Sequence, residues 1–184
     1  MPKVLIPLAQ SCEELEAVTI IDLMRRAQFD VTTACLEPEL TTIQASRGVK
    51  LFADTTLNQA LTQEYDMIVL PGGLPGADYL NQDSRVIQSL HNMAHQGKYV
   101  AAICAAPRAL ATANLLEGKQ VTSYPGTLDQ LDIPGMTYVN EAVVVDGNIV
   151  TSRGPGTAMD FALTLIELLG GAEARAQVEA PLLR

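Results

Sequence analysis

A strand that turns directly into a helix is predicted by the stretch Tyr99-Val100-Ala101-Ala102-Ile103-Cys104-Ala105-Ala106-Pro107. Its first five residues form an unbroken apolar run, typical of a buried strand. Pro107 suits the first turn of a helix, where amides lack partners anyway. Such a turn holds Cys104 at the carboxyl edge of a sheet, facing free backbone N–H groups and the positive end of the helix dipole. We therefore expect a stabilised thiolate, and so a lowered pKa, at Cys104.

Cysteine usage indicates the redox compartment. The chain has three cysteines, Cys12, Cys35 and Cys104. An odd number without a disulfide framework suits a reducing environment, so we expect a cytoplasmic protein. Most free cysteines are unreactive small hydrophobes in the core, and packing alone is therefore the alternative interpretation of Cys104.

Apolar strand patterns alternate with helical patterns along nearly the whole chain. This alternation predicts an α/β fold, with a largely parallel sheet, helices on both faces and ligands bound at the carboxyl ends of the strands. The predicted strands are residues 4–8, 31–36, 66–70, 99–103 and 149–152, with hairpins pairing 42–45 with 49–53 and 141–145 with 149–152. The predicted helices are residues 13–28, 84–96, the turns after Cys104, 157–169 and a short tail after Gly171.

Size and charge exclude several classes of partner. The 184 residues indicate one domain, 1–184, with a substantial core. A net charge of −9 without a Lys/Arg cluster argues against nucleic acid. The apolar run at residues 4–9 is too short for a signal peptide or a membrane span. We expect neither nucleic acid nor a membrane as a partner.

The first predicted helix carries a carboxylate on its apolar face. Ser11 is predicted as the N-cap of a capping box with Glu14, which gives Glu14 a structural role. Glu16 instead shares its face with three apolar residues, Ile20, Leu23 and Ala27. Burial raises the pKa of a carboxyl, so we expect Glu16 to share a proton with Cys104. The alternative is a slight roll of the helix that leaves Glu16 half exposed.

A glycine pair follows the strand predicted at 66–70. The loop Pro71-Gly72-Gly73 matches neither a dinucleotide-binding nor a P-loop pattern. Its backbone N–H groups, together with that of Ala105, could form an oxyanion hole beside Cys104. The alternative interpretation is a tight turn without function.

The two histidines, His91 and His95, lie four residues apart on one predicted helix. This spacing places both on one helix face, but no third metal ligand is indicated, and a solvated face is the better interpretation. Neither histidine lies at the carboxyl end of a strand, so Cys104 has no histidine partner of the protease type. We expect no metal at this pair.

Five short motifs carry a family resemblance across essentially the whole chain. They are Glu13-Glu14-Leu15-Glu16-Ala17-Val18, Ser46-Arg47-Gly48-Val49, the stretch from Tyr65-Asp66 through Leu70-Pro71-Gly72-Gly73, Ala101-Ala102-Ile103-Cys104-Ala105-Ala106-Pro107 and Thr151-Ser152-Arg153-Gly154-Pro155-Gly156-Thr157. In this order they resemble the ThiJ/PfpI superfamily, specifically its DJ-one branch, which includes the bacterial YajL-type proteins.

The resemblance implies a flavodoxin-like three-layer sandwich that forms a homodimer and needs no cofactor. It implies that Cys104 is an oxidation-prone nucleophile with Glu16 as its protonated partner. The amide pocket would be formed by Gly72, Gly73 and Ala105. Arg47 would reach the site, from its own subunit or from across the dimer.

The chain departs from the family pattern at several positions. Tyr124 stands where several members have a histidine, and a phenol is a poor base near neutral pH. Ala105 follows the cysteine where the protease-like branch has a histidine, so we expect no peptidase activity. Ala45 stands where some relatives have a second cysteine.

Two functional hypotheses follow, besides a purely structural dimerising module. The first is a cofactor-independent glyoxalase or deglycase, in which Cys104 attacks methylglyoxal, glyoxal or glycated adducts and Glu16 moves the proton. The second is a redox-sensing chaperone that acts on misfolded proteins. In it, Cys104 stops at sulfinate, held by a hydrogen bond from Glu16.

Overall fold

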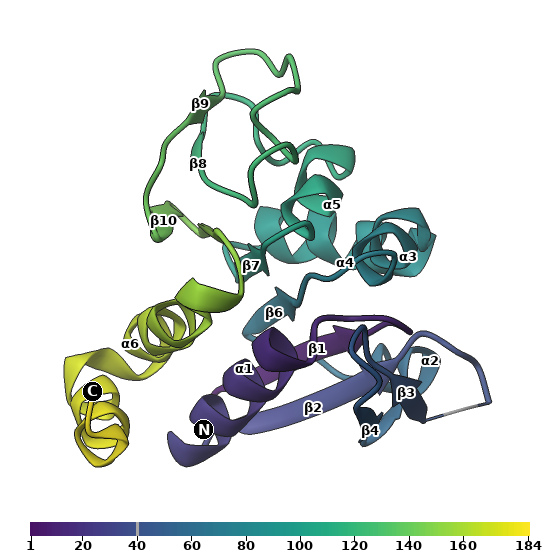
Figure 1. The fold of residues 1–184 in the computed structure, drawn as a ribbon, viewed down its shortest axis with the longest axis vertical. Helices are drawn as coiled ribbons and strands as arrows, with labels where there is room; N and C mark the ends of the chain where they lie inside the picture. The colour runs from purple at the N-terminus through teal and green to yellow at the C-terminus, as the bar shows by residue number, and fades with distance from the viewer. Residues whose placement is uncertain (40) are drawn as a thin grey trace.

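The computed structural model describes residues 1–39 and 41–184. One sheet contains the strands β1 (Lys3–Leu8), β2 (Asp30–Cys35), β5 (Thr55–Thr56), β6 (Met67–Leu70), β7 (Tyr99–Ile103), β10 (Val143–Asp146) and β11 (Ile149–Ser152). Their order is β10–β11–β7–β6–β1–β2–β5, and every neighbouring pair is parallel except β10 with β11 (Figure 1). The expected α/β class with a mostly parallel sheet is confirmed.

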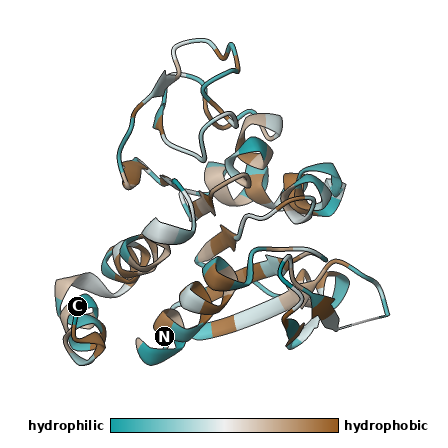
Figure 2. Ribbon diagram, in the orientation of Figure 1, coloured by the Kyte–Doolittle hydropathy of each residue, from teal (hydrophilic) through white to brown (hydrophobic). Residues whose placement is uncertain are grey.

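The central strands are apolar because both of their faces are covered. All four residues of β6 are buried, and in Figure 2 this strand is coloured hydrophobic. Along β7, Val100 and Ala102 belong to one core cluster, whereas Ala101 and Ile103 belong to the other. This alternation follows from the two-residue period of a strand.

Helices form a layer on each face of the sheet (Figure 1). On one face lie α1 (Glu14–Arg26) and α6 (Ala158–Glu179), which pack against each other. On the other lie α2 (Leu57–Ala60), α3 (Gly76–Gln82), α4 (Ser84–His95) and α5 (Pro107–Thr112). The three-layer sandwich is therefore confirmed, and no helix of the described residues is long and apolar enough to cross a membrane.

Two small sheets lie outside the main one. The strands β3 (Thr42–Gln44) and β4 (Lys50–Phe52) form the hairpin that the sequence predicted. The parallel pair β8 (Gln120–Val121) and β9 (Thr137–Tyr138) was not predicted, and neither were β5, α2 and α3. These elements are too short for their hydrophobic period to be recognised in the sequence.

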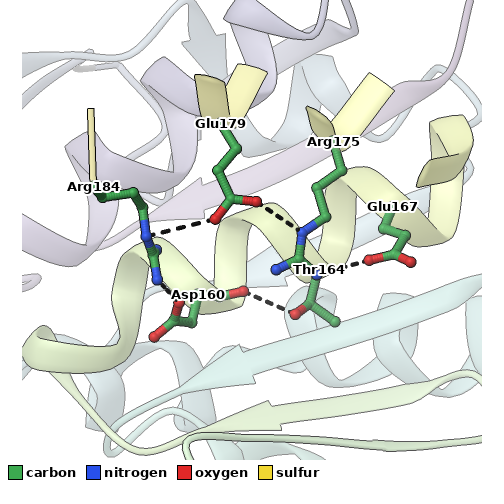
Figure 3. A network of polar contacts seen from close by, with 6 residues as sticks. All are labelled: Asp160, Thr164, Glu167, Arg175, Glu179 and Arg184. Atoms are coloured by element: carbon green, nitrogen blue, oxygen red, sulfur yellow. Dashed lines mark hydrogen bonds and ion pairs between the residues drawn. The ribbon is translucent and has the colours of Figure 1, made fainter. Parts of the chain in front are cut away.

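The helix α6 consists of two helical parts that meet at Gly171, and the second part folds back on the first. Gly171 has a φ of 82°, which turns the chain between the two helical parts, as the glycine pair predicted. Figure 3 shows the polar contacts that fix the tail. Arg175 pairs with Glu167 at 2.7 Å, and Arg184 pairs with Asp160. A 3₁₀ turn, η2 (Ala180–Leu182), follows the helix, and another, η1 (Pro155–Thr157), precedes it.

The expected capping box at the start of α1 is wrong. Glu13, not Ser11, occupies the N-cap position, and no side chain caps the helix there. Ser11 has a φ of 61°, and its amide donates to the carbonyl of Gln44 at 2.8 Å. The carboxylate of Glu14 accepts instead from the Ser46 hydroxyl at 2.9 Å. Long-range hydrogen bonds to neighbouring segments replace the local helix cap. A local sequence pattern does not predict such long-range bonds.

Candidate active site

Cys104 lies on a strained turn between β7 and α5. Its φ of 65° is unusual for a residue other than glycine. Bonds on both sides fix this backbone: the Cys104 amide donates to the Ser152 carbonyl at 3.0 Å, and its carbonyl accepts from the Tyr124 amide at 2.8 Å. Strain of this kind persists where the surroundings hold it, and it is concentrated at functional sites.

The register of the sheet brings three loops to Cys104. Leu70 of β6 is opposite Ala102 of β7, and Ser152 of β11 is opposite Ile103. The carboxyl ends of these strands therefore lie at one edge. The loop Pro71-Gly72-Gly73 emerges beside the cysteine, as expected for ligand-binding loops in parallel sheets.

Glu16 is fully buried on α1 and faces the same point. The Gly72 amide donates to its Oε2 at 2.8 Å, and Oε1 has no hydrogen-bond partner among the described residues. Burial raises the pKa of Glu16 to about 7, although the bonds from Gly72 and Cys104 oppose the shift. Oε1 is thus the oxygen free to carry a proton.

Gly72 holds the carboxyl and the cysteine close together. A methyl group on its Cα would lie 2.6 Å from Cys104 Cβ and 2.8 Å from Glu16 Oε2. No side chain fits between the two groups, so a glycine is required there for steric reasons. Cys104 and Glu16 therefore meet across the Cα of Gly72, as the sequence predicted for the pair.

The expected lowering of the Cys104 pKa is wrong. Burial and the negative charge of Glu16 raise the pKa of the thiol to about 12, more than the amides of Gly73 and Ala105 lower it. The sequence argument counted the turn and its amides, but neither the burial of the thiol nor the charge of Glu16 on α1. Protonation of Glu16 would remove the second of these two contributions but not the first, which is burial.

The three backbone amides expected to form one oxyanion hole have different hydrogen-bond partners. The N–H groups of Gly73 and Ala105 bond to the Cys104 sulfur. The Gly72 amide is engaged by Glu16 and is not directed at the sulfur. Two of the three expected amides, rather than all three, are therefore directed at the cysteine sulfur.

A cavity of about 520 Å³ opens in front of Cys104. Tyr124, whose surface is 53% exposed, forms part of its wall, and its ring packs on Gly154, where an added methyl group would lie 3.3 Å from it. The lining residues that the sequence had singled out are Arg47, Gly73, Cys104, Ala105 and Tyr124. Glu13, Ser46 and Pro155 also line it and stand in the motifs that carry the resemblance. The lining residues that the sequence had not singled out are Leu74, Asp78, Arg108, Pro125, Gly126 and Thr127.

Arg47 reaches this cavity within its own chain, and Glu14 fixes the loop that carries it. Glu14 Oε1 accepts from the Arg47 amide at 2.8 Å, and Oε2 accepts from Ser46. Although burial opposes it, these bonds hold the pKa of Glu14 below its usual value. Ser46 is next to Arg47 in the sequence, and Arg108 follows Cys104 by one helical turn. Closeness in sequence to a predicted site residue is therefore the signal that could have identified Ser46 and Arg108.

The remaining cysteines and histidines lie elsewhere. Cys12 and Cys35 are buried in the core, and burial with nearby Glu14 raises the pKa of Cys12 to about 12. The rings of His91 and His95 stack on α4 with centroids 4.1 Å apart. Within residues 1–39 and 41–184, no group of three His, Cys, Asp or Glu side chains could hold a metal ion.

The fold and the site define an α/β sandwich with a cysteine–carboxyl pair at the carboxyl edge of its sheet. Residues 2–168 match the family model described as the DJ-1/PfpI family, and the chain belongs to this family.

Relatives and solved structures agree with this assignment. The chain is 44% identical to Protein DJ-1 homolog A of Arabidopsis thaliana over 98% of its own length, but it spans only 46% of that protein. It is 43% identical to the Parkinson disease protein 7 homolog of Danio rerio, covering 98% of this chain and 96% of the relative. Oxidised Toxoplasma gondii DJ-1 superposes with a TM-score of 0.93 at 40% identity, covering 100% and 98% of the two chains.

One more distant relative is named for an activity. The glutathione-independent glyoxalase DJR-1.2 of Caenorhabditis elegans is 29% identical over 94% of this chain and 91% of its own length. The family therefore includes a glyoxalase.

The buried carboxyl makes stability depend on pH. The pKa of Glu16 is raised to about 7 in the folded protein, so its contribution to stability is present below its usual value of 4.5 and is lost as pH rises through 7. Glu16→Gln removes this loss. We expect the variant to gain roughly 3 kcal/mol relative to wild type between pH 4.5 and 8.

Urea unfolding at a series of pH values measures this difference. Glu64→Gln, an exposed carboxyl, is the matched control and should follow the wild-type curve. Parallel curves for wild type and Glu16→Gln would show that Glu16 keeps an ordinary pKa.

Proposed function

We propose that this protein is a cofactor-independent glyoxalase or deglycase that acts on reactive dicarbonyls through Cys104 and Glu16. The observation that carries the proposal is the placement of Glu16 beside Cys104 across Gly72, with Cys104 lining a cavity. A nucleophile beside a proton acceptor is the arrangement that covalent catalysis requires. The glyoxalase named among the relatives supports the choice of substrate.

The first step joins the thiol to the aldehyde. Glu16 takes the thiol proton, and the sulfur attacks the aldehyde carbon of methylglyoxal or glyoxal. The electron pair of the C=O bond moves to oxygen, where the amides of Gly73 and Ala105 stabilise the negative charge. Glu16 returns its proton to that oxygen, and the product is a hemithioacetal. Glycated thiols and amines would form the same kind of adduct.

The second step moves a proton between adjacent carbons. The Glu16 carboxylate removes the C–H proton of the hemithioacetal, which leaves an enediolate, and then delivers that proton to the neighbouring carbon. The hydroxyl proton of the former aldehyde carbon passes to the second oxygen, so the first carbon becomes a carbonyl and the second an alcohol. The result is a thioester on Cys104. Water hydrolyses it to lactate or glycolate and restores the thiol. The pKa of Glu16 near 7 suits a group that gives and takes protons at neutral pH.

Tyr124 has a supporting role in this scheme. Its side chain lines the cavity beside the cysteine, where some relatives are expected to carry a histidine. A phenol donates a hydrogen bond well but accepts protons poorly. We assign Tyr124 to hold the oxygen of the second carbonyl, and leave the proton transfers to Glu16.

Turnover of methylglyoxal, followed by lactate formation, tests the proposal. Cys104→Ala should lower kcat/KM by at least about 1,000-fold because the nucleophile is lost. Glu16→Gln should lower kcat by about 100-fold or more because the proton acceptor is lost. Cys35→Ala removes a buried thiol outside the cavity and should retain activity.

The proposal fails if Cys104→Ala converts methylglyoxal at the wild-type rate. Alkylation of Cys104 by iodoacetamide across the pH range provides an independent check of the pair. Its pH profile should differ between wild type and Glu16→Gln, whereas identical profiles would show that the two groups are not coupled.

A second candidate function is a redox sensor with chaperone action on misfolded proteins. Cys104 is partly exposed, whereas Cys12 and Cys35 are buried, so Cys104 is the thiol that an oxidant reaches. A similar solved structure is an oxidised form. Protonated Glu16 would donate a hydrogen bond to a sulfinate oxygen and stop the oxidation there.

Mild peroxide distinguishes this candidate. We expect a mass gain of two oxygen atoms on the peptide carrying Cys104, with Cys12 and Cys35 unmodified. In Glu16→Gln the sulfinate should proceed to sulfonate more readily. Oxidation of Cys12 or Cys35 before Cys104 would exclude the sensor.

We also propose that the protein is a homodimer through α1 and the β3–β4 hairpin. Leu15 and Val18 on α1 and Phe52 on the hairpin are exposed to 51%, 45% and 75%. Val18, Leu51 and Phe52 line a groove between these elements. Exposed apolar side chains gathered in this way are typical of subunit contacts.

Light scattering on wild type and Val18→Glu tests the dimer. A charge placed on an apolar interface should convert the dimer to a monomer at micromolar concentration. Tyr79→Glu, on α3 across the sheet, is the control and should leave the dimer intact. A monomeric wild type would exclude the interface.

A further inference from the structure

The cavity carries two arginines that the proposed chemistry does not use. Arg47 and Arg108 both line it and both are exposed. Among the described residues, neither forms an ion pair with a carboxylate. The carboxylates that line the same cavity are Glu13, which accepts from the Ser46 hydroxyl at 3.0 Å, and Asp78.

Stability does not explain Arg108. It follows Pro107 in the first turn of α5, where the helix dipole disfavours a cation. Other arginines have structural partners: Arg85 pairs with Asp83 at 2.5 Å, and Arg175 with Glu167. An unpaired guanidinium in a cavity next to a nucleophile points to a ligand.

The size of the cavity is the second, independent observation. A volume of about 520 Å³ lies within the range that holds drug-sized molecules. Methylglyoxal, with five non-hydrogen atoms, would leave most of that volume to water. A longer substrate would use both the cysteine at the floor and the arginines on the wall.

We propose that Arg108, assisted by Arg47, binds a carboxylate on the far end of the substrate, so that the preferred substrates are 2-oxoaldehydes bearing a carboxylate. This inference rests on the proposed function and names its substrate class. A guanidinium fork matches a carboxylate in geometry and charge. A single negative charge also suits a wall that carries Glu13 and Asp78 better than the double charge of a phosphate does.

The chemistry at Cys104 is unchanged for such a substrate. In 4,5-dioxopentanoate, the aldehyde carbon becomes a carboxylate and the adjacent ketone becomes an alcohol, with one water consumed. The product is 2-hydroxyglutarate. The distal carboxylate takes no part in the bond changes, so its contribution is binding and orientation.

The first experiment needs no turnover. Iodoacetate and iodoacetamide are similar in size and differ in charge, and both alkylate Cys104 with loss of iodide. We expect Arg108→Gln to lower the ratio of the iodoacetate rate to the iodoacetamide rate by about three- to tenfold, with a smaller loss at high salt. Arg26→Gln on α1 removes the same charge outside the cavity and should keep the wild-type ratio. Arg108→Lys should fall between Arg108→Gln and wild type.

The second experiment compares 4,5-dioxopentanoate with its methyl ester as substrates. Wild type should show a higher kcat/KM for the free acid, and Arg108→Gln should reduce the acid-to-ester ratio about tenfold, mainly through KM. Equal ratios in Arg108→Gln and Arg26→Gln, for alkylation and for turnover, would overturn the inference. If wild type converts methylglyoxal but shows no preference for the acid, the glyoxalase proposal stands and this one fails. If wild type converts no dicarbonyl, the glyoxalase proposal fails, and the alkylation ratio still decides whether Arg108 recognises a carboxylate.

Discussion

The burial of one carboxyl group against a glycine is the constraint on which the site depends. Glu16 is removed from water, receives one amide bond from Gly72 and lies against the Cys104 thiol. An ionised carboxylate is costly in that position, so the group holds a proton near neutral pH. Cys104 then experiences either a neighbouring acid or a neighbouring negative charge. The pKa of the thiol therefore depends on its burial and on the charge of Glu16 as well as on the amides of its own turn.

The rest of the fold serves to bring these groups together. Parallel strands end at one edge, which places the loops after β6, β7 and β11 side by side. The packing of α1 on the sheet places Glu16 beside Cys104. Hydrogen bonds from residues 46 and 47 to the Glu14 carboxylate hold Arg47 at the cavity. Each functional group therefore comes from a different segment, and the sheet fixes their separation. Scaffolds of this kind allow the cavity wall to vary while the cysteine and carboxyl stay in place.

Much of this arrangement could be predicted from residues alone. The run before Cys104 showed a buried strand, and the turn after it showed where the strand ended. The apolar neighbours of Glu16 on its helix showed that it points inward. The wrong predictions also came from local sequence patterns. Ser11 was predicted as a helix cap because its pattern fits one, but its backbone is used by a neighbouring strand. The Gly72 amide was assigned to an oxyanion, but a buried carboxylate binds it first.

The sequence by itself determined the class of fold, the strand–turn–helix at Cys104 and the inward carboxyl of Glu16, because hydrophobic periodicity and turn chemistry are local properties. Only the tertiary structure decided the electrostatics of the pair and the composition of the cavity wall. The pKa of Cys104 depends in part on the charge of Glu16, which is 88 residues away in the chain. A role for Arg108 is suggested only by its position in the cavity wall. Distances between segments set these properties, and a linear pattern does not contain them.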